Sequence, residues 1–194
     1  MSAEIRDTGN FTEGASMQSE IERIGKRLFA EGLLGASCGN MSVRSGNGFF
    51  ITRSGSYLDV PGSPVYVPME GDVPEHASSE YRVHRATYSI TNHQAIVHAH
   101  PPHAVACSLS CDRIVPVDSE GMMLTPLIPV VGGACGGDDL AEQVASALKV
   151  YRVVVARGHG TFAAGENLDE AYILTSLAEH SCRILFLTGA AGRR

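Results

Sequence analysis

The 194-residue sequence lacks the features that would place a protein in a membrane or on nucleic acid. It has no run of about eighteen apolar residues, so we expect no membrane-spanning helix. Residues 1–16 lack the basic start and the apolar centre of a secretory signal peptide. The 15 basic side chains are fewer than the 21 acidic ones, and they form no basic stripe. We therefore expect neither membrane nor nucleic acid among the partners of the protein.

The sequence also lacks the cysteine patterns of disulfide frameworks and of many zinc sites. Its five cysteines are odd in number and show no CxxC spacing. We interpret them as reduced thiols of a cytoplasmic protein. Only two lysines are present, Lys26 and Lys149, and neither belongs to a motif typical of an active site. Catalysis through a lysine Schiff base is therefore not expected.

What the sequence does contain is an ordinary globular composition with many glycines and histidines. Hydrophobic residues make up 44% and charged residues 19%, a balance that argues against disorder. The length fits one domain, and no internal repeat or linker is visible. Few side chains of residues 1–15 suit burial, so we predict a flexible N-terminal arm at 1–15 and a single domain at 16–194.

Helix and strand patterns alternate irregularly along this domain. Apolar and capping patterns predict a first helix from residue 16 to near Gly32 and Gly35. Further helices are predicted at 78–91, 102–110, 138–148 and 167–187, with Ser78 or Ser79 as the N-cap of the helix at 78–91. Strands are predicted at 41–44, 48–52, 65–69, 94–100, 114–117, 127–131 and 152–156. This order predicts an α/β fold with a mixed sheet covered by helices, not a pure βαβ repeat.

Three histidines carry the clearest functional signal. His98 and His100 alternate in a predicted strand, so both rings project from one face and can chelate one ion. His159 lies between two glycines after another strand, where close backbone approach lets its ring reach the same point. Three neutral imidazoles with an open fourth position are typical of catalytic zinc, although an HxH pair alone also arises by chance. The remaining histidines, His84 among them, are interpreted as structural or surface residues.

Three polar turns form a candidate anion site, namely Gly39-Asn40, Ser54-Gly55 and Ser78-Ser79. Free backbone N–H groups at such turns favour a phosphate, and Arg53 adds a positive charge. Each turn taken singly also has an ordinary explanation as a cap or a loop. Glu80 follows the last turn, and it is either a general base beside the cation or a surface carboxylate near a helix N-terminus.

Taken together and in this order, the motifs resemble the class II aldolase/adducin family. The resemblance runs from about residue 20 to residue 188. Five motifs in one order are far more specific than any of them alone. The matching segments are 32–33 with 39–44, 51–55, 78–80 with His84, 98–101 and 158–160.

The resemblance implies a three-layer α/β/α sandwich around a mixed, largely antiparallel sheet. It implies a divalent metal, usually Zn²⁺ with Mn²⁺, Fe²⁺ or Co²⁺ as alternatives. The implied metal ligands are His98, His100 and His159, joined by Glu80 when no substrate is bound. The implied phosphate site consists of Asn40, Ser54, Gly55, Ser78 and Ser79. Members are commonly homotetramers, so a homo-oligomer, specifically a tetramer, is expected.

The implied reaction is that of a lyase of carbohydrate metabolism. A ketose 1-phosphate such as L-fuculose 1-phosphate would be cleaved to dihydroxyacetone phosphate and an aldehyde through a metal-stabilised enediolate. Glu80 would be the acid/base group. Glu120 aligns with a family tyrosine and would take over part of the proton transfer that this tyrosine performs. The alternatives are a sugar-phosphate epimerase, dehydratase or decarboxylase on the same fold, and a non-catalytic adducin-like interaction module.

Overall fold

The structure, a computed structural model, describes residues 8–191 of the chain. Its helices are α1 (Thr8–Ala30), α2 (Tyr81–Ile90), α3 (Pro102–Ser108), α4 (Ser119–Leu124), α5 (Asp138–Leu148) and α6 (Leu168–Leu187). Its strands are β1 (Asn40–Ser45), β2 (Gly48–Ile51), β3 (Val65–Pro68), β4 (Ala95–Ala99), β5 (Arg113–Ile114), β6 (Ile128–Val131), β7 (Val153–Ala156) and β8 (Gly160–Gly165).

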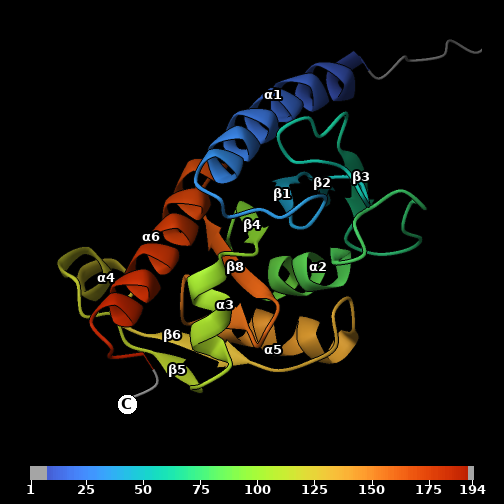
Figure 1. The fold of residues 1–194 in the computed structure, drawn as a ribbon. Helices are drawn as coiled ribbons and strands as arrows, with labels where there is room; N and C mark the ends of the chain where they lie inside the picture. The colour runs from blue at the N-terminus through green and yellow to red at the C-terminus, as the bar shows by residue number, and fades with distance from the viewer. Residues whose placement is uncertain (1–7, 192–194) are drawn as a thin grey trace, which may run out of the picture.

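The strands form one eight-stranded sheet in the order β3-β2-β1-β4-β8-β7-β6-β5. Only β6 and β7 run parallel, and every other neighbouring pair in the described residues is antiparallel. Helices α2 and α5 cover one face of the sheet, and α1, α3 and α6 cover the other (Figure 1). The predicted three-layer α/β/α sandwich with a largely antiparallel sheet is therefore confirmed.

Successive side chains of β4 point to opposite faces of the sheet and enter different apolar clusters. Ile96 joins the apolar cluster under α2 and α5, whereas Ala95, Val97 and Ala99 join the cluster under α1 and α6. Alternate residues of a strand share one face, so His98 projects toward the α2 and α5 side with Ile96. Because both faces are covered, the polar His98 is enclosed and is only 1% exposed.

Three elements differ from the sequence prediction. Helix α1 begins at Thr8, so residues 8–15 of the predicted arm are helical, and residues 1–7 lie outside the described part of the chain. Strand β8 and helix α4 were not predicted. The β8 sequence GTFAAG has little of the β-branched character expected of a strand, and its pairing with β4 and β7 compensates for this. The division into an arm and one domain stays a prediction.

The helices also bear on the expectation about membranes. Across residues 8–191, no helix combines the length and the apolar character needed to cross a bilayer.

Candidate metal centre

The sheet register places the first candidate ligands at the end of β4. His98 pairs with Asn40 of β1 on one side and with Phe162 of β8 on the other. His100 follows directly after β4, and its backbone N–H donates to Leu33 O at 2.9 Å. Pro101 and α3 then begin, so both histidines stand where the strand stops. The predicted position of the pair at a sheet end is what the structure shows.

The ring of His98 is held in one orientation and one tautomer. It stacks on Phe162 with 4.0 Å between ring centroids and 15° between ring planes. Its Nδ1 lies 2.9 Å from Thr161 O, and a carbonyl oxygen only accepts, so Nδ1 carries the proton. Nε2 is then left with its lone pair toward the neighbouring rings. Burial, together with the charges of His100 and His159, lowers the pKa of His98 well below its usual value, so the ring is neutral.

His159 reaches the pair because the turn between β7 and β8 passes very close to β4. Gly158 has φ +67°, a conformation that glycine adopts without strain. At Gly160 a Cβ atom would lie 2.3 Å from Ala99 O and 3.0 Å from His98 Cε1. No larger residue fits there without pushing the turn and its histidine away. The GHG sequence is therefore a geometric requirement of the site.

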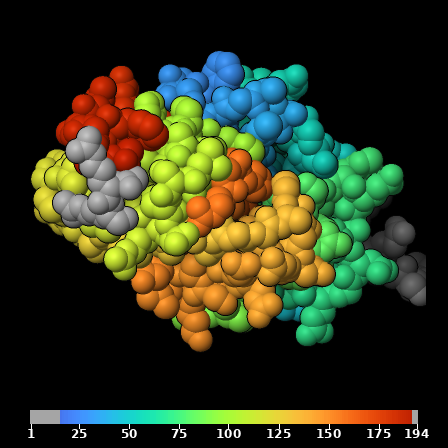
Figure 2. Space-filling view, turned by 60° about the horizontal axis from the view of Figure 1, so that its bottom comes forward, coloured from blue at the N-terminus to red at the C-terminus, as the bar shows by residue number. Residues whose placement is uncertain are grey.

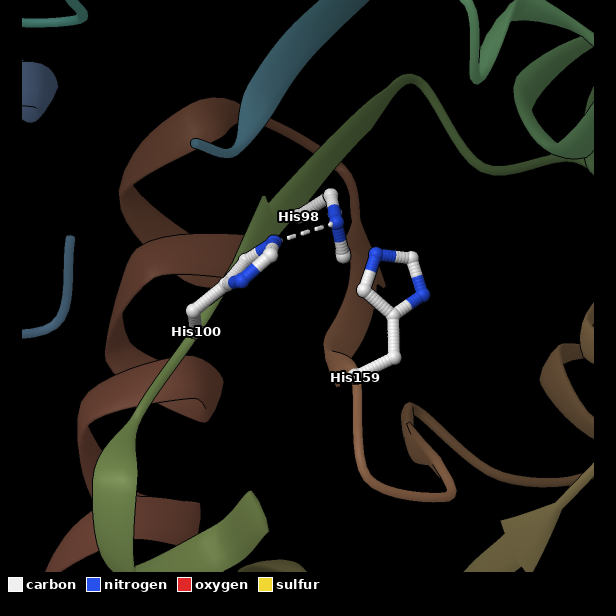
Figure 3. Close-up of side chains that lie close together, drawn as sticks. All are labelled: His98, His100 and His159. Atoms are coloured by element: carbon white, nitrogen blue, oxygen red, sulfur yellow. Dashed lines mark hydrogen bonds between the residues drawn. The ribbon is translucent and has the colours of Figure 1, made fainter. Parts of the chain in front are cut away.

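The three imidazoles converge on one point, as Figure 3 shows. Ring centroids are 4.8 Å apart for His98 and His100, 4.8 Å for His98 and His159, and 5.0 Å for His100 and His159. The Nε2 atoms of His98 and His100 are 3.0 Å apart. Two nitrogens on a tetrahedral zinc ion would be about 3.3 Å apart, since each Zn–N bond is about 2.0–2.1 Å. The donor set and its spacing therefore fit a divalent cation.

Glu80 lies beside His159 and is almost completely buried. Its Oε1 is 3.9 Å from His159 Nε2, and it accepts hydrogen bonds from Gly136 N at 3.0 Å and Cys135 Sγ at 2.8 Å. Its Oε2 is buried and has no hydrogen-bond partner among the described residues. A buried carboxylate oxygen without a partner costs free energy, and a ligand bound in the cavity that Glu80 lines would offset this cost. Helix α2 starts at Tyr81, so its N-cap is Glu80 and not the predicted Ser78 or Ser79.

A buried hydrogen-bond chain orients Asn40 at the edge of the same cavity. His84 Nε2 donates to Asn40 Oδ1 at 2.6 Å, which leaves the Asn40 NH₂ group free for a ligand. His84 Nδ1 lies 2.6 Å from Ser42 Oγ, which in turn lies 2.7 Å from Tyr88 OH. His84 was predicted to be structural or on the surface, and the structure makes it a support of the candidate site. The sequence pattern that could have indicated this support is the spacing of Glu80, His84 and Tyr88, which are four residues apart and share one helix face.

The buried His84 leads to a prediction about pH. Burial lowers its pKa to about 3, whereas in the unfolded chain the pKa is about 6.5. As the pH falls below about 6.5, protons bind the unfolded state and not the folded one, so stability is lost progressively toward pH 3. Between pH 7 and pH 5, His84 alone should lower the free energy of unfolding by about 2 kcal/mol.

Urea unfolding of metal-free protein at the two pH values tests this prediction. His84→Gln removes the titrating ring, while the other histidines stay in both proteins and their contributions cancel. The loss of stability between pH 7 and pH 5 should be about 2 kcal/mol smaller in the variant. An equal loss in both proteins would contradict the role of His84.

The predicted phosphate residues gather around the histidines. A cavity of about 170 Å³ is lined by Arg53, Glu80, the three histidines and Cys135, together with the predicted phosphate residues Asn40, Ser54, Gly55, Ser78 and Ser79. Figure 2 shows the chain near residues 100–110, 135–148 and 155–165 lying together on one face. The backbone N–H groups of Ser54 and Ser78 are already bonded to His76 O and Thr52 O. The anion contacts available from these two serines are therefore hydroxyls, not the amides expected from the sequence.

Two residues have a different place in the structure from the one that the sequence suggests. Glu120 lies in α4, is exposed, and accepts a hydrogen bond from Ser119 at 2.6 Å. It does not line the cavity, so its part in proton transfer stays a prediction that the single chain does not support.

Cys135 was not predicted for the site, yet its thiol contacts Glu80 and lies 3.6 Å from His159 Nε2. Burial and the carboxylate of Glu80 raise the pKa of Cys135 to about 11, so the free thiol is protonated at neutral pH.

The known proteins that are similar to this chain point to one family. The sequence model of the Class II Aldolase and Adducin N-terminal domain matches residues 19–186. L-Fuculose phosphate aldolase of Escherichia coli is 31% identical over 170 residues, which cover 81% of this chain and 76% of that protein. The crystal structure of L-fuculose-1-phosphate aldolase from Thermus thermophilus is 40% identical, covers 90% of this chain and 94% of its own, and has a TM-score of 0.86.

A third relative has a different activity in its name. A Nocardia farcinica protein, named as a probable bifunctional methylthioribose-1-phosphate isomerase and methylthioribulose-1-phosphate dehydratase, is 25% identical over 206 residues. The match covers 92% of this chain and 37% of that protein. Related chains are therefore named for more than one reaction.

Proposed function

Because the chain belongs to the class II aldolase and adducin family, we propose that it is a metal-dependent lyase acting on a ketose 1-phosphate such as L-fuculose 1-phosphate. Its products would be dihydroxyacetone phosphate and an aldehyde. The observation that carries the proposal is the convergence of three imidazoles beside Glu80, whose buried Oε2 has no hydrogen-bond partner. An interaction module without chemistry would have no need for this arrangement.

His98, His100 and His159 would hold the cation, which we propose to be zinc. When bound, such a cation supplies Lewis-acid stabilisation of the negative charge that develops on substrate oxygens, worth several kcal/mol. The protein contributes the rigidity of the site. Stacking on Phe162 and the bond to Thr161 O keep His98 in its metal-binding tautomer without further reorganisation.

Asn40, Ser54, Gly55, Ser78 and Ser79 would hold the phosphate. His84 fixes the Asn40 amide with its NH₂ group available, and the serine hydroxyls can donate to anionic oxygens. Arg53 lines the same cavity and supplies a positive charge. Holding the phosphate places the carbons to be separated next to the histidines, so that cleavage starts from one defined pose.

Glu80 would carry the proton in the reaction. When the C3–C4 bond of the substrate breaks, the C4 hydroxyl would give its proton to water as C4 becomes the aldehyde carbonyl, and the electron pair of the bond would stay on C3. Protonated Glu80 Oε2 would deliver its proton to C3 and regain one from water. Oε1 is held by Cys135 and Gly136, so the carboxyl group keeps one orientation while Oε2 exchanges its proton. Proton transfer by a positioned group typically contributes roughly 10²–10⁴-fold to the rate.

A retro-aldol screen tests the proposed activity. Zinc-loaded protein is incubated with a panel of ketose 1-phosphates, and released dihydroxyacetone phosphate is measured by enzymatic reduction. We expect release from at least one member of the panel, and much less from the same sugar without phosphate, because the phosphate contacts are then lost. Loss of water or of carbon dioxide from related substrates, without any dihydroxyacetone phosphate, would replace the aldolase by a dehydratase or a decarboxylase.

Location and assembly are further proposals. All five cysteines are free, which agrees with the reducing conditions of the cytoplasm. A homotetramer is proposed from family membership, and light scattering of the purified protein measures it directly.

A further inference from the structure

The third histidine of the candidate metal centre is held differently from the other two. His98 lies in β4 and His100 follows directly after it, so the hydrogen-bond ladder of the sheet fixes their relative positions. His159 comes from the turn between β7 and β8, a separate segment on the other side of the cluster (Figure 3). Glycines flank it on both sides, and glycine leaves the backbone freer to change conformation than any other residue. The position of this ring therefore depends on the contacts that hold the turn.

The end of α3 supplies the first of these contacts. The backbone N–H of Gly158 donates to Ser108 Oγ at 2.9 Å, and the same hydroxyl donates to Val105 O at 2.6 Å. Because the hydroxyl proton is bound to Val105 O, only the lone pairs of Ser108 Oγ are available to the turn, and the hydroxyl is an acceptor of fixed direction. Ser108 is 0% exposed, so water does not compete for either bond.

The side chain of Arg157, at the start of the turn, binds the same end of α3. Its Nη1 donates to Ser108 O at 2.6 Å and to Cys111 O at 3.2 Å. Its Nη2 pairs with Asp112 at 2.6 Å, but that carboxylate is 95% exposed, and exposed ion pairs contribute little. The bonds to the two carbonyl groups are therefore the important ones. A planar guanidinium can reach several acceptors at once, and a positive charge is favoured at the C-terminus of a helix.

Helix α3 connects this turn with the other two candidate ligands. It begins at Pro102, two residues after His100, and ends at Ser108, the residue that contacts the turn. Glu179 of α6 accepts the backbone N–H of His103 at 2.9 Å, which fixes the beginning of α3. Seven helical residues rise about 10 Å. A short helix that is anchored at both ends thus sets the distance between the histidine pair and the turn.

From these contacts, and resting on the metal site of the proposed function, we infer that Ser108 and Arg157 are positioning residues that hold the His159 ring where it binds the cation. Without them, the turn between its two glycines samples other conformations, and only a fraction of the folded molecules has the ring in place. Apparent affinity for a ligand falls by that fraction. The strands β7 and β8 stay paired, so we expect the loss in metal affinity and not in the fold.

Zinc affinity, measured by competition with a chelating dye, tests the inference without measuring activity. Ser108→Ala and Arg157→Gln should each lower the affinity roughly tenfold or more. Ser110→Ala and Arg113→Gln are the matched controls, since they make the same changes at exposed residues nearby. The Ser110 hydroxyl donates to Cys107 O, within α3, and not to the turn. Loss of a positive charge by itself favours a bound cation, so a lower affinity of Arg157→Gln would not be an electrostatic effect.

Hydrogen exchange in the metal-free protein separates positioning from a general structural role. In Arg157→Gln the amide of Gly158 should exchange faster, although its own acceptor, Ser108 Oγ, is still present. The amides of β7 and β8 should keep their protection, and Arg113→Gln should match the unmodified protein at all of these positions. A variant that is only less stable would instead exchange faster throughout the strands.

The outcomes separate this inference from the proposed function. Unchanged zinc affinity in Ser108→Ala and Arg157→Gln, with zinc bound by the unmodified protein, would overturn the positioning role and leave the lyase proposal intact. Equal losses in the controls, or faster exchange throughout the strands, would also overturn it. An unmodified protein that binds no zinc would overturn both. Ser108 is buried, so if Ser108→Ala does not fold, the partly exposed Arg157 decides the question.

Discussion

Replacing His159 by alanine is expected to abolish zinc binding and lyase activity together. The loss of His159 leaves only two imidazoles on one side of the ion. Zinc content, measured by elemental analysis, should fall from about one ion per chain to a small fraction. Zinc affinity should fall by roughly a hundredfold or more, and turnover by roughly 10³-fold.

His159 is better suited to this test than His98. The ring of His98 is stacked on Phe162 in the core, so its removal would leave a cavity. His159 stands on a turn and is half-buried, so the fold should survive its truncation. His180→Ala, an exposed histidine on α6, is the matched control and should keep both zinc and activity. Full activity of His159→Ala, or of protein stripped by a chelator, would remove the cation from the mechanism.

Glu80→Gln is expected to separate metal binding from catalysis. Glutamine has nearly the shape of glutamate, and its oxygen can still accept from Gly136 and Cys135. It cannot deliver or remove a proton, so turnover should fall by roughly 10²–10⁴-fold while zinc content stays the same. Proton transfer at C3 is measured directly as exchange of the C3 proton of dihydroxyacetone phosphate in deuterated water. The rate of this exchange should fall by the same factor as turnover.

The control for this variant is Glu142→Gln, an exposed carboxylate on α5. It makes the same change of charge and should leave exchange and turnover unchanged. If Glu80→Gln exchanges the C3 proton at the normal rate, the carboxyl group is not the proton carrier. If it loses zinc as well, Glu80 is a metal ligand in the resting protein.

Some features of the site are readable from short sequence patterns because they depend on local geometry. In a strand, residues two apart share a face, and this alone puts His98 and His100 on one side of β4. The proline after His100 ends the strand, so the end of the sheet is also predictable. The hairpin of β1 and β2 follows from the turn residues between Ser45 and Gly48.

Other features depend on contacts between distant segments and have no local signal. The strand β8 consists of residues with weak strand preference, and it forms because β4 and β7 supply partners on both sides. The Asn40–His84 bond joins residues 44 positions apart, so the support of Asn40 by His84 is invisible until α2 packs on the sheet. The placement of Glu120 in α4, outside the cavity, likewise follows from packing against α6.

The amino-acid sequence by itself determined the α/β class, the paired imidazoles of β4, and a set of motifs whose order matches one family. Those conclusions depend on periodicity and on residue type, which act over a few neighbouring positions. Only the tertiary structure decided which groups share the cavity: it added Cys135 and His84, left Glu120 outside, and showed the backbone N–H groups of Ser54 and Ser78 to be occupied. Those outcomes depend on where loops far apart in the chain come to rest, and this is set by packing of the whole core.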